Sequence, residues 1–260
     1  MLTGIDHLVI AVPDLDAAVA SYRALGFTVI PGGRHTVGTH NALVPFADGA
    51  YLELIAFYEP NPAHRWWWPL QRGGGLVDFC AATDGLASDV AAWRAAGVAL
   101  ADPAPMTRRR PDGYEVQWVL AIPAEEQRGV VPFLIEDRTP RAERVPTGVT
   151  HPNGVQGVDT LAVAVAALDP ARGWYAAALH QPGEPMERPE LGARGHRFAL
   201  GPHYVELLAP TGETGPVADW LRRRGPSPYA ASLRTGGATR GPLDPSQTAG
   251  ARLTLVGGGP

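Results

Sequence analysis

Short runs of apolar residues recur along this chain, and glycine or proline residues separate many of them. Alternating runs of this kind predict strands, whereas apolar residues three or four positions apart predict helices. In the first 57 residues the pattern gives the order β-α-β-β-β, with strands expected at residues 4–12, 27–30, 41–46 and 51–57 and a helix at residues 15–25 that stops at Gly26.

The same pattern returns in the second part of the chain. Residues 4–12 read GIDHLVIAV and residues 157–165 read GVDTLAVAV, while YLEL at residues 51–54 is matched by YVEL at residues 204–207. Matched segments at both ends of a stretch of this length indicate an internal duplication. We therefore expect two related halves, residues 1–145 and 150–260.

Each half is expected to hold two β-α-β-β-β units. In the first half these are residues 1–57 and 75–139, and in the second half they are residues 155–210 and a truncated unit at 225–258. The truncated unit lacks a helical pattern, because residues 236–250 are rich in glycine and proline. The predicted fold class is α+β, built from tandem βαβββ units.

Composition and charge narrow the classes of function. Hydrophobic residues make up 45% of the 260 residues, so each half can bury a core, and the formal net charge of −4 argues against a nucleic-acid partner. Cys80 is the single cysteine, which excludes an internal disulfide. No signal peptide and no apolar run of about 18 residues is visible, so we expect a cytoplasmic protein without a membrane partner.

The opening strand GIDHL, a helix and then YLEL resemble a unit of the vicinal oxygen chelate superfamily, the glyoxalase/bleomycin-resistance/dioxygenase-like folds. Residues 32–43, 110–113 and 131–136 more narrowly resemble bacterial glyoxalase-like domain proteins. The resemblance implies mixed sheets curved around a central cleft that holds a small molecule. The superfamily includes lyases, epimerases, extradiol dioxygenases and drug-binding resistance proteins, so the fold leaves the reaction open.

The resemblance also implies a metal site. Its members place a histidine on the first strand of a unit and a carboxylate on the last, and here these are His7 and Glu53. In the second unit Asp78 stands where the second histidine is expected, and Glu136 lies near the last carboxylate. Imidazole and carboxylate ligands suit divalent Ni, Zn, Mn, Fe or Co.

Other interpretations of these four residues stay open. His7 can be a hydrogen-bonded core histidine, Asp78 can bind backbone amides, and a shift of one residue turns Glu136 to the other face of its strand. In that case no metal is bound. The second half carries Thr160 and Thr254 at two of the ligand positions, so it is expected to have lost any metal site.

Further candidates for the site lie outside these positions. His35, His40 and Asn41 cluster in the segment GGRH…GTHN, where they can bind a substrate or hold an irregular loop together. We predict that His40 is an auxiliary acid. One of Arg108, Arg109 and Arg110, with Arg110 preferred, is expected to pair with a substrate carboxylate, and the alternative is a solvated hairpin tip. Trp118 is expected to line an apolar cleft, and the alternative is a core position.

Two functions follow from these residues. The first is a metal-dependent lyase or isomerase in which His7 and Glu53 hold the ion and a carboxylate such as Glu53 acts as base. The second is a binding or sequestration protein without turnover. Extradiol dioxygenase chemistry ranks below both, because it uses two histidines and one carboxylate and only one histidine is in place on the strands. The expected partner is a small molecule; a homodimer, and pairing of units within or between chains, are left open.

Overall fold

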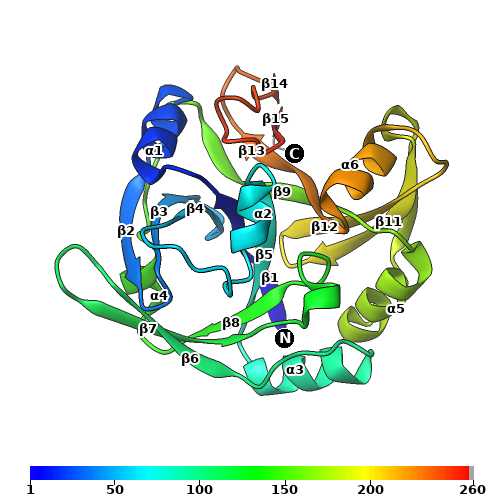
Figure 1. Cartoon of the computed structure of the whole chain (residues 1–260), viewed down its shortest axis with the longest axis horizontal. Coiled ribbons are helices and arrows are strands. Elements are labelled where there is room, and N and C mark those ends of the chain that lie inside the picture. Colours follow the sequence, from blue (N-terminus) through cyan, green and yellow to red (C-terminus); the bar gives the residue numbers. More distant parts are fainter. Residues whose placement is uncertain (258–260) are drawn as a thin grey trace.

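The computed structural model describes residues 1–257, which form a closed barrel and a second, open sheet (Figure 1). The barrel has the strand order β1-β4-β3-β2-β6-β7-β8-β5. Its first unit consists of β1 (Leu2–Ala11), α1 (Leu15–Ala24), β2 (Ile30–His35), β3 (Thr39–Pro45) and β4 (Tyr51–Phe57). Its second unit consists of β5 (Gly75–Thr83), α3 (Leu86–Ala95), β6 (Ala104–Arg109), β7 (Glu115–Ala121) and β8 (Phe133–Asp137).

The two units of the barrel pair with each other inside one chain. Strand β1 runs parallel to β4 and antiparallel to β5, and β2 meets β6 at the opposite seam. The linker between the units contains the short helix α2 (Trp67–Gln71), and η1 (Glu125–Gln127) precedes β8. The expected order of elements is confirmed, and the curved sheet closes completely.

The open sheet has the order β10-β11-β12-β9-β13-β15-β14. It is built from β9 (Val155–Ala164), α5 (Leu168–Leu179), β10 (Glu184–Arg188), η2 (Pro189–Leu191), β11 (Ala193–Leu200), β12 (His203–Pro210), α6 (Pro216–Arg224), β13 (Ser227–Thr235), β14 (Gly241–Pro242) and β15 (Leu253–Gly257). Within the described residues, no helix lies between β13 and β15, as the glycine-rich sequence predicts. The tandem α+β architecture is therefore confirmed.

The segment between the two sheets contains a short helix that the sequence pattern did not reveal, α4 (Arg141–Arg144). Its arginines reach across to Asp6 on β1. The helix is held by these long-range contacts rather than by a local apolar pattern, so the sequence pattern does not predict it.

One hydrophobic core joins the barrel to the open sheet. It includes Leu8 and Ile10 from β1 as well as Leu161 and Leu233 from the open sheet. Helices α3 and α5 lie side by side (Figure 1), where Trp93 meets Tyr175 edge to face at 5.1 Å between ring centroids. The two sheets therefore bury apolar surface against each other.

The β11–β12 turn adds a polar contact between the sheets. The backbone N–H of Ile5 donates to His203 Nδ1 at 2.9 Å. Gly201 in this turn has a φ of +59°, and a Cβ there would stand 2.0 Å from the carbonyl oxygen of Thr3. Only glycine allows this approach, so the turn lies directly against the strand that carries His7.

No helix in residues 1–257 is long and apolar enough to span a membrane.

Candidate functional site

The interior of the barrel contains a cavity of about 370 Å³. Most of its exposed surface is apolar, and polar and charged side chains interrupt it. The apolar residues include Val37, Ile55, Trp66, Met106, Trp118, Leu120, Ile122, Phe133 and Ile135; the polar ones include His7, His35, Asn41, Glu53, Arg65, Arg108, Arg128 and Arg144. A concave apolar site with a few polar groups is typical of small-molecule binding.

His7 and Glu53 lie together in this wall. In the parallel pair β1–β4, His7 is opposite Tyr51 and Val9 is opposite Glu53, so the alternating side chains of both strands place His7 and Glu53 on one face. The distance between His7 Nε2 and Glu53 Oε2 is 3.5 Å. The sequence therefore placed these two groups correctly in one hollow.

Asp6 orients the His7 imidazole from behind. The His7 Nδ1 atom lies 2.7 Å from Asp6 Oδ1, and the ring stacks on Tyr51 at 4.6 Å. Asp6 is fully buried, and the guanidinium groups of Arg144 and Arg141, together with His7, hold its pKa well below its ordinary value despite burial, which acts in the opposite direction. An ionised Asp6 accepts a hydrogen bond from the Nδ1–H of His7, so the lone pair of Nε2 faces the cavity.

Glu53 is held in the same way. Its Oε1 accepts a hydrogen bond from Asn41 Nδ2 at 2.6 Å. Asn41 Oδ1 is buried and finds no hydrogen-bond partner among the described residues. The contact with Asn41 fixes the carboxylate and leaves Oε2 facing His7.

Asp78 is buried nearby but is already engaged. It lies opposite Val9 in the β1–β5 pair, accepts from Trp66 Nε1 at 2.9 Å and from the Phe79 backbone at 3.0 Å, and is 3.7 Å from Arg65 Nε. Its pKa is raised because burial outweighs these contacts. The structure does not bring Asp78 to the His7–Glu53 pair as a free group.

Glu136 lies away from the cavity. Its Oε2 accepts from the Leu86 backbone at the start of α3 at 3.0 Å, and its Oε1 pairs with Arg138 at 2.5 Å. Its neighbour Ile135 lines the cavity instead. Because neighbouring side chains on β8 point to opposite faces, the observed register turns Glu136 away from the cavity.

Phe133 takes the position that a second carboxylate would need. Asp78 is the counterpart of His7, so Cys80, two residues later, is the counterpart of Val9. Phe133 lies opposite Cys80 in the parallel pair β5–β8, just as Glu53 lies opposite Val9 in the parallel pair β1–β4. The barrel therefore presents one carboxylate and one aromatic ring at equivalent places.

Two further predicted residues line the cavity. His35 Nδ1 lies 2.9 Å from Thr39 Oγ1, and its ring meets Trp118 edge to face at 6.2 Å. Burial lowers the pKa of His35 to about 4, so the ring is neutral at neutral pH. Trp118 lines an apolar cavity as expected.

His40 and Arg110 lie elsewhere. His40 alternates with Thr39 and Asn41 on β3, so it points to the other face, where it meets Tyr58. Arg110 pairs with Asp112 and Glu143 beyond the end of β6. Neither side chain lines the cavity of the His7–Glu53 pair.

Arg65, Arg128 and Arg144 also line the cavity and were not selected from the sequence, whereas Arg108 was named only as an alternative to Arg110. Arg108 had a local signal, because it alternates with Met106 on β6, and both line the cavity. Arg65 and Arg128 lie outside the strands, where no periodicity indicates direction.

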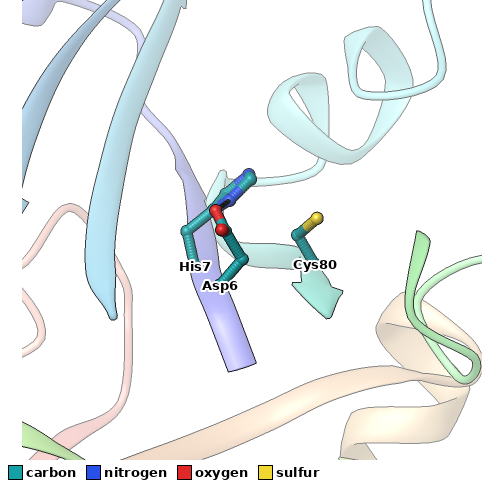
Figure 2. A group of neighbouring side chains, drawn as sticks. All are labelled: Asp6, His7 and Cys80. Atoms are coloured by element: carbon teal, nitrogen blue, oxygen red, sulfur yellow. Dashed lines mark hydrogen bonds and ion pairs between the residues drawn. The ribbon is translucent and has the colours of Figure 1, made fainter. Parts of the chain in front are cut away.

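A second group of ligand-type atoms lies behind His7. Asp6, His7 and Cys80 have one such atom each within 4.8 Å of one another, and Figure 2 shows their side chains on adjacent strands. A group of this composition could hold a metal ion. Asp6 already pairs with Arg144 and Arg141, and burial raises the pKa of the Cys80 thiol well above its ordinary value.

The equivalent place in the open sheet has different chemistry. Thr160 replaces the histidine and donates to Asp159 at 2.7 Å. Glu206, the counterpart of Glu53, accepts from Arg188 and Arg197, each at 2.6 Å. Thr254 lies opposite Ser232 in the β13–β15 pair. In the second half, two arginines therefore bind the carboxylate that corresponds to Glu53, and a threonine stands in place of the histidine.

Comparison with solved structures supports the same fold. A hypothetical protein from Staphylococcus aureus has a TM-score of 0.70 at 14% identity, and the match covers 97% of this chain and 98% of that one. A variant of 4-hydroxymandelate synthase from Streptomyces coelicolor has a TM-score of 0.65 at 19% identity, covering 90% of this chain and 72% of that one. No curated protein matches the sequence.

The sequence itself also matches a family. Residues 5–179 fit the glyoxalase-like domain, a stretch that begins within β1, covers the rest of the barrel and continues through α5. Together with the tandem βαβββ architecture, this match places the fold in the vicinal oxygen chelate superfamily. The chain belongs to the glyoxalase-like domain family.

Proposed function

We propose that the barrel binds a small oxygenated molecule beside a divalent metal ion held by His7 and Glu53, and acts on that molecule as a lyase or isomerase. The observation that carries this proposal is the 3.5 Å approach of His7 Nε2 to Glu53 Oε2 in the wall of a largely apolar cavity. Asp6 and Asn41 bind the other polar atoms of these two side chains, so His7 Nε2 and Glu53 Oε2 are available to a metal ion.

The donor set fits an ion with two protein ligands. A histidine that ligates a metal almost always gives its other N–H to a carboxylate, a carbonyl or water, and Asp6 is placed for this role. The ion would act as a Lewis acid on an oxygen of the bound molecule. The mixed nitrogen and oxygen donors suit Ni, Zn, Mn, Fe or Co.

The chain's own residues supply the remaining chemistry. Asp6 fixes the tautomer of His7, and Asn41 holds one oxygen of Glu53 so that the other faces the cavity. That oxygen would accept a proton from the bound molecule when it does not hold the ion. The apolar walls around Trp118 and Phe133 exclude water, which strengthens each polar contact inside.

Metal analysis of the whole chain tests the proposal. After incubation with Ni, Mn, Fe, Co or Zn and desalting, we expect about one ion per wild-type chain. His7→Ala and Glu53→Gln should each bind the ion at least about ten-fold more weakly, and so should Asp6→Asn, because partners behind a ligand change affinity by about 10–100-fold. His40→Ala is the matched control and should bind as wild type. Protein that stays metal-free under all five conditions would contradict the proposal.

Sequestration without turnover is the second candidate. It is favoured by the reduced ligand set, since Asp78 is engaged by Arg65 and Trp66 and Phe133 stands at the register of the second carboxylate. In this case compounds that raise the melting temperature should do so equally in wild type and in His7→Ala, and without added metal.

A further inference from the structure

Three arginines in the cavity wall have buried N–H groups without an acceptor among the described residues. The atoms are Arg65 Nη1, Arg108 Nε and Arg128 Nε. A buried donor without a partner is destabilising, and more so when it is charged. Three such groups around one cavity indicate that something else completes their contacts.

Arg108 is the most buried of the three. Its side chain is 3% exposed, and its Nη2 donates to the Arg144 carbonyl at 2.8 Å. No carboxylate within residues 1–257 lies within 4.0 Å of its guanidinium. Burial lowers the pKa of Arg108, as expected for a cation that lacks a close counter-charge.

Arg65 and Arg128 form a second concentration of positive charge. Arg65 stands 4.1 Å over the Phe133 ring and 4.4 Å over the Trp66 ring, and Asp78 is its carboxylate neighbour at 3.7 Å. Arg128 has no such neighbour among the described residues. Both arginines also line an adjacent cavity of about 390 Å³, so they lie between the barrel interior and that cavity.

The charges around the barrel cavity do not balance. Arg144 is matched by Asp6 and Asp137, and Arg65 is matched by Asp78. Arg108 and Arg128 then face Glu53 as the one carboxylate in the wall, which leaves an excess of one positive charge. A divalent ion at His7 and Glu53 would increase this excess. A buried charge is stable only when it is paired, so the cavity favours an anion.

We infer that the ligand of the barrel cavity is an organic monoanion whose carboxylate-type head group is bound by Arg108 and whose apolar body lies against Trp118 and Phe133. This inference rests on the proposed use of the cavity as the ligand site and does not require the metal. Guanidinium groups suit such a head group because they pair with it through charge-assisted hydrogen bonds. The aromatic and aliphatic walls fit a ring or a short chain.

Matched pairs of acids and amides test the inference. Phenylacetate and 3-phenylpropionate are titrated calorimetrically into the whole chain in EDTA, alongside phenylacetamide and 3-phenylpropionamide. We expect each acid to bind at least about ten-fold more tightly than its amide, because hydrogen bonds to a charged group are stronger than those to a neutral one. Phenyl phosphate, included as a second anion, distinguishes a phosphate from a carboxylate head group.

Variants identify the source of the preference. The variant Arg108→Met should lose about ten-fold or more of the affinity for the acids and keep that for the amides. Arg109→Met is the matched control, because Arg109 follows Arg108 on the same strand and is exposed. Methionine preserves much of the side-chain volume, and circular dichroism with the melting temperature of the free variants verifies that they fold.

Amides that bind as tightly as the acids, an Arg108→Met variant that keeps the preference, or no binding of any of the anions at about 10 mM would each overturn the inference. His7→Ala separates it from the metal proposal. If the protein takes up no metal and His7→Ala still binds the acids, the proposed metal site fails while the anion site stands.

Discussion

Asp6→Asn is the sharpest test of the charge network behind the candidate site. The carboxylate of Asp6 accepts from Arg144 Nη1 at 3.0 Å and Nη2 at 2.9 Å, and it also pairs with Arg141 and His7. An asparagine keeps one oxygen acceptor but loses the charge. Breaking a buried ion pair from one side costs about 3–5 kcal/mol.

We expect a loss of unfolding free energy near the lower limit, about 3 kcal/mol, because Asp137 still holds Arg144 Nε at 2.5 Å. The assay is urea denaturation at pH 7, followed by circular dichroism. The duplication supplies the control, since Asp159 occupies the equivalent place in the second half. Its side chain is 35% exposed and 3.8 Å from Arg234, so Asp159→Asn should cost less than about 1 kcal/mol.

The dependence on pH gives a second readout. The pKa of Asp6 is lower in the folded chain than in the unfolded chain, so its contribution to stability is present above the unfolded pKa of about 3.9 and is lost as the pH falls toward the folded pKa. The stability difference between wild type and Asp6→Asn should therefore be constant near neutral pH and shrink below about pH 4. A cost below about 1 kcal/mol, or a difference that does not change between pH 7 and pH 2, would refute the reasoning.

Three further predictions concern stability. His35 has a pKa of about 4 in the folded chain and about 6.5 in the unfolded chain. The free energy of unfolding should therefore fall as the pH drops from about 6.5 to about 4, by up to about 1.4 kcal/mol per pH unit. His35→Gln should remove this part of the dependence of the urea midpoint on pH, and an unchanged dependence would speak against it. Trp93→Ala should cost about 3–5 kcal/mol in urea, because the ring is 1% exposed, and a cost under 1 would contradict its placement. Gly201→Ala should lower the melting temperature by several degrees, because its Cβ meets the Thr3 carbonyl; an equal melting temperature would disprove the contact.

Much of the fold could be predicted because it depends on local periodicity. The alternation of strands and the spacing of helices gave the order of the units, and the repeat gave their number. The meeting of His7 with Glu53 also followed, since it needs only two strands of known direction and the two-residue period of a strand.

The rest of the site depends on contacts that no local pattern encodes. Glu136 was selected from the sequence, but a difference of one residue in register turns its side chain away from the cavity. Arg110 lies outside the cavity because β6 ends at Arg109. Asp78 is occupied by Trp66 and Arg65 from the linker, and Asp6 by arginines about 135 residues further along the chain. These are tertiary ion pairs and hydrogen bonds, which follow from the assembled barrel and not from its sequence.

The contacts of Gly201 and His203 with the first strand indicate a role for the second half, in which threonines stand at two of the expected metal-ligand positions. That turn braces the backbone two residues before His7, across 198 positions of sequence. A shortened protein ending near residue 145 would lose this brace together with the apolar partner of α3. The second copy therefore supports the first strand of the barrel, and damage to its β11–β12 turn should disturb the position of His7, although the turn does not line the cavity.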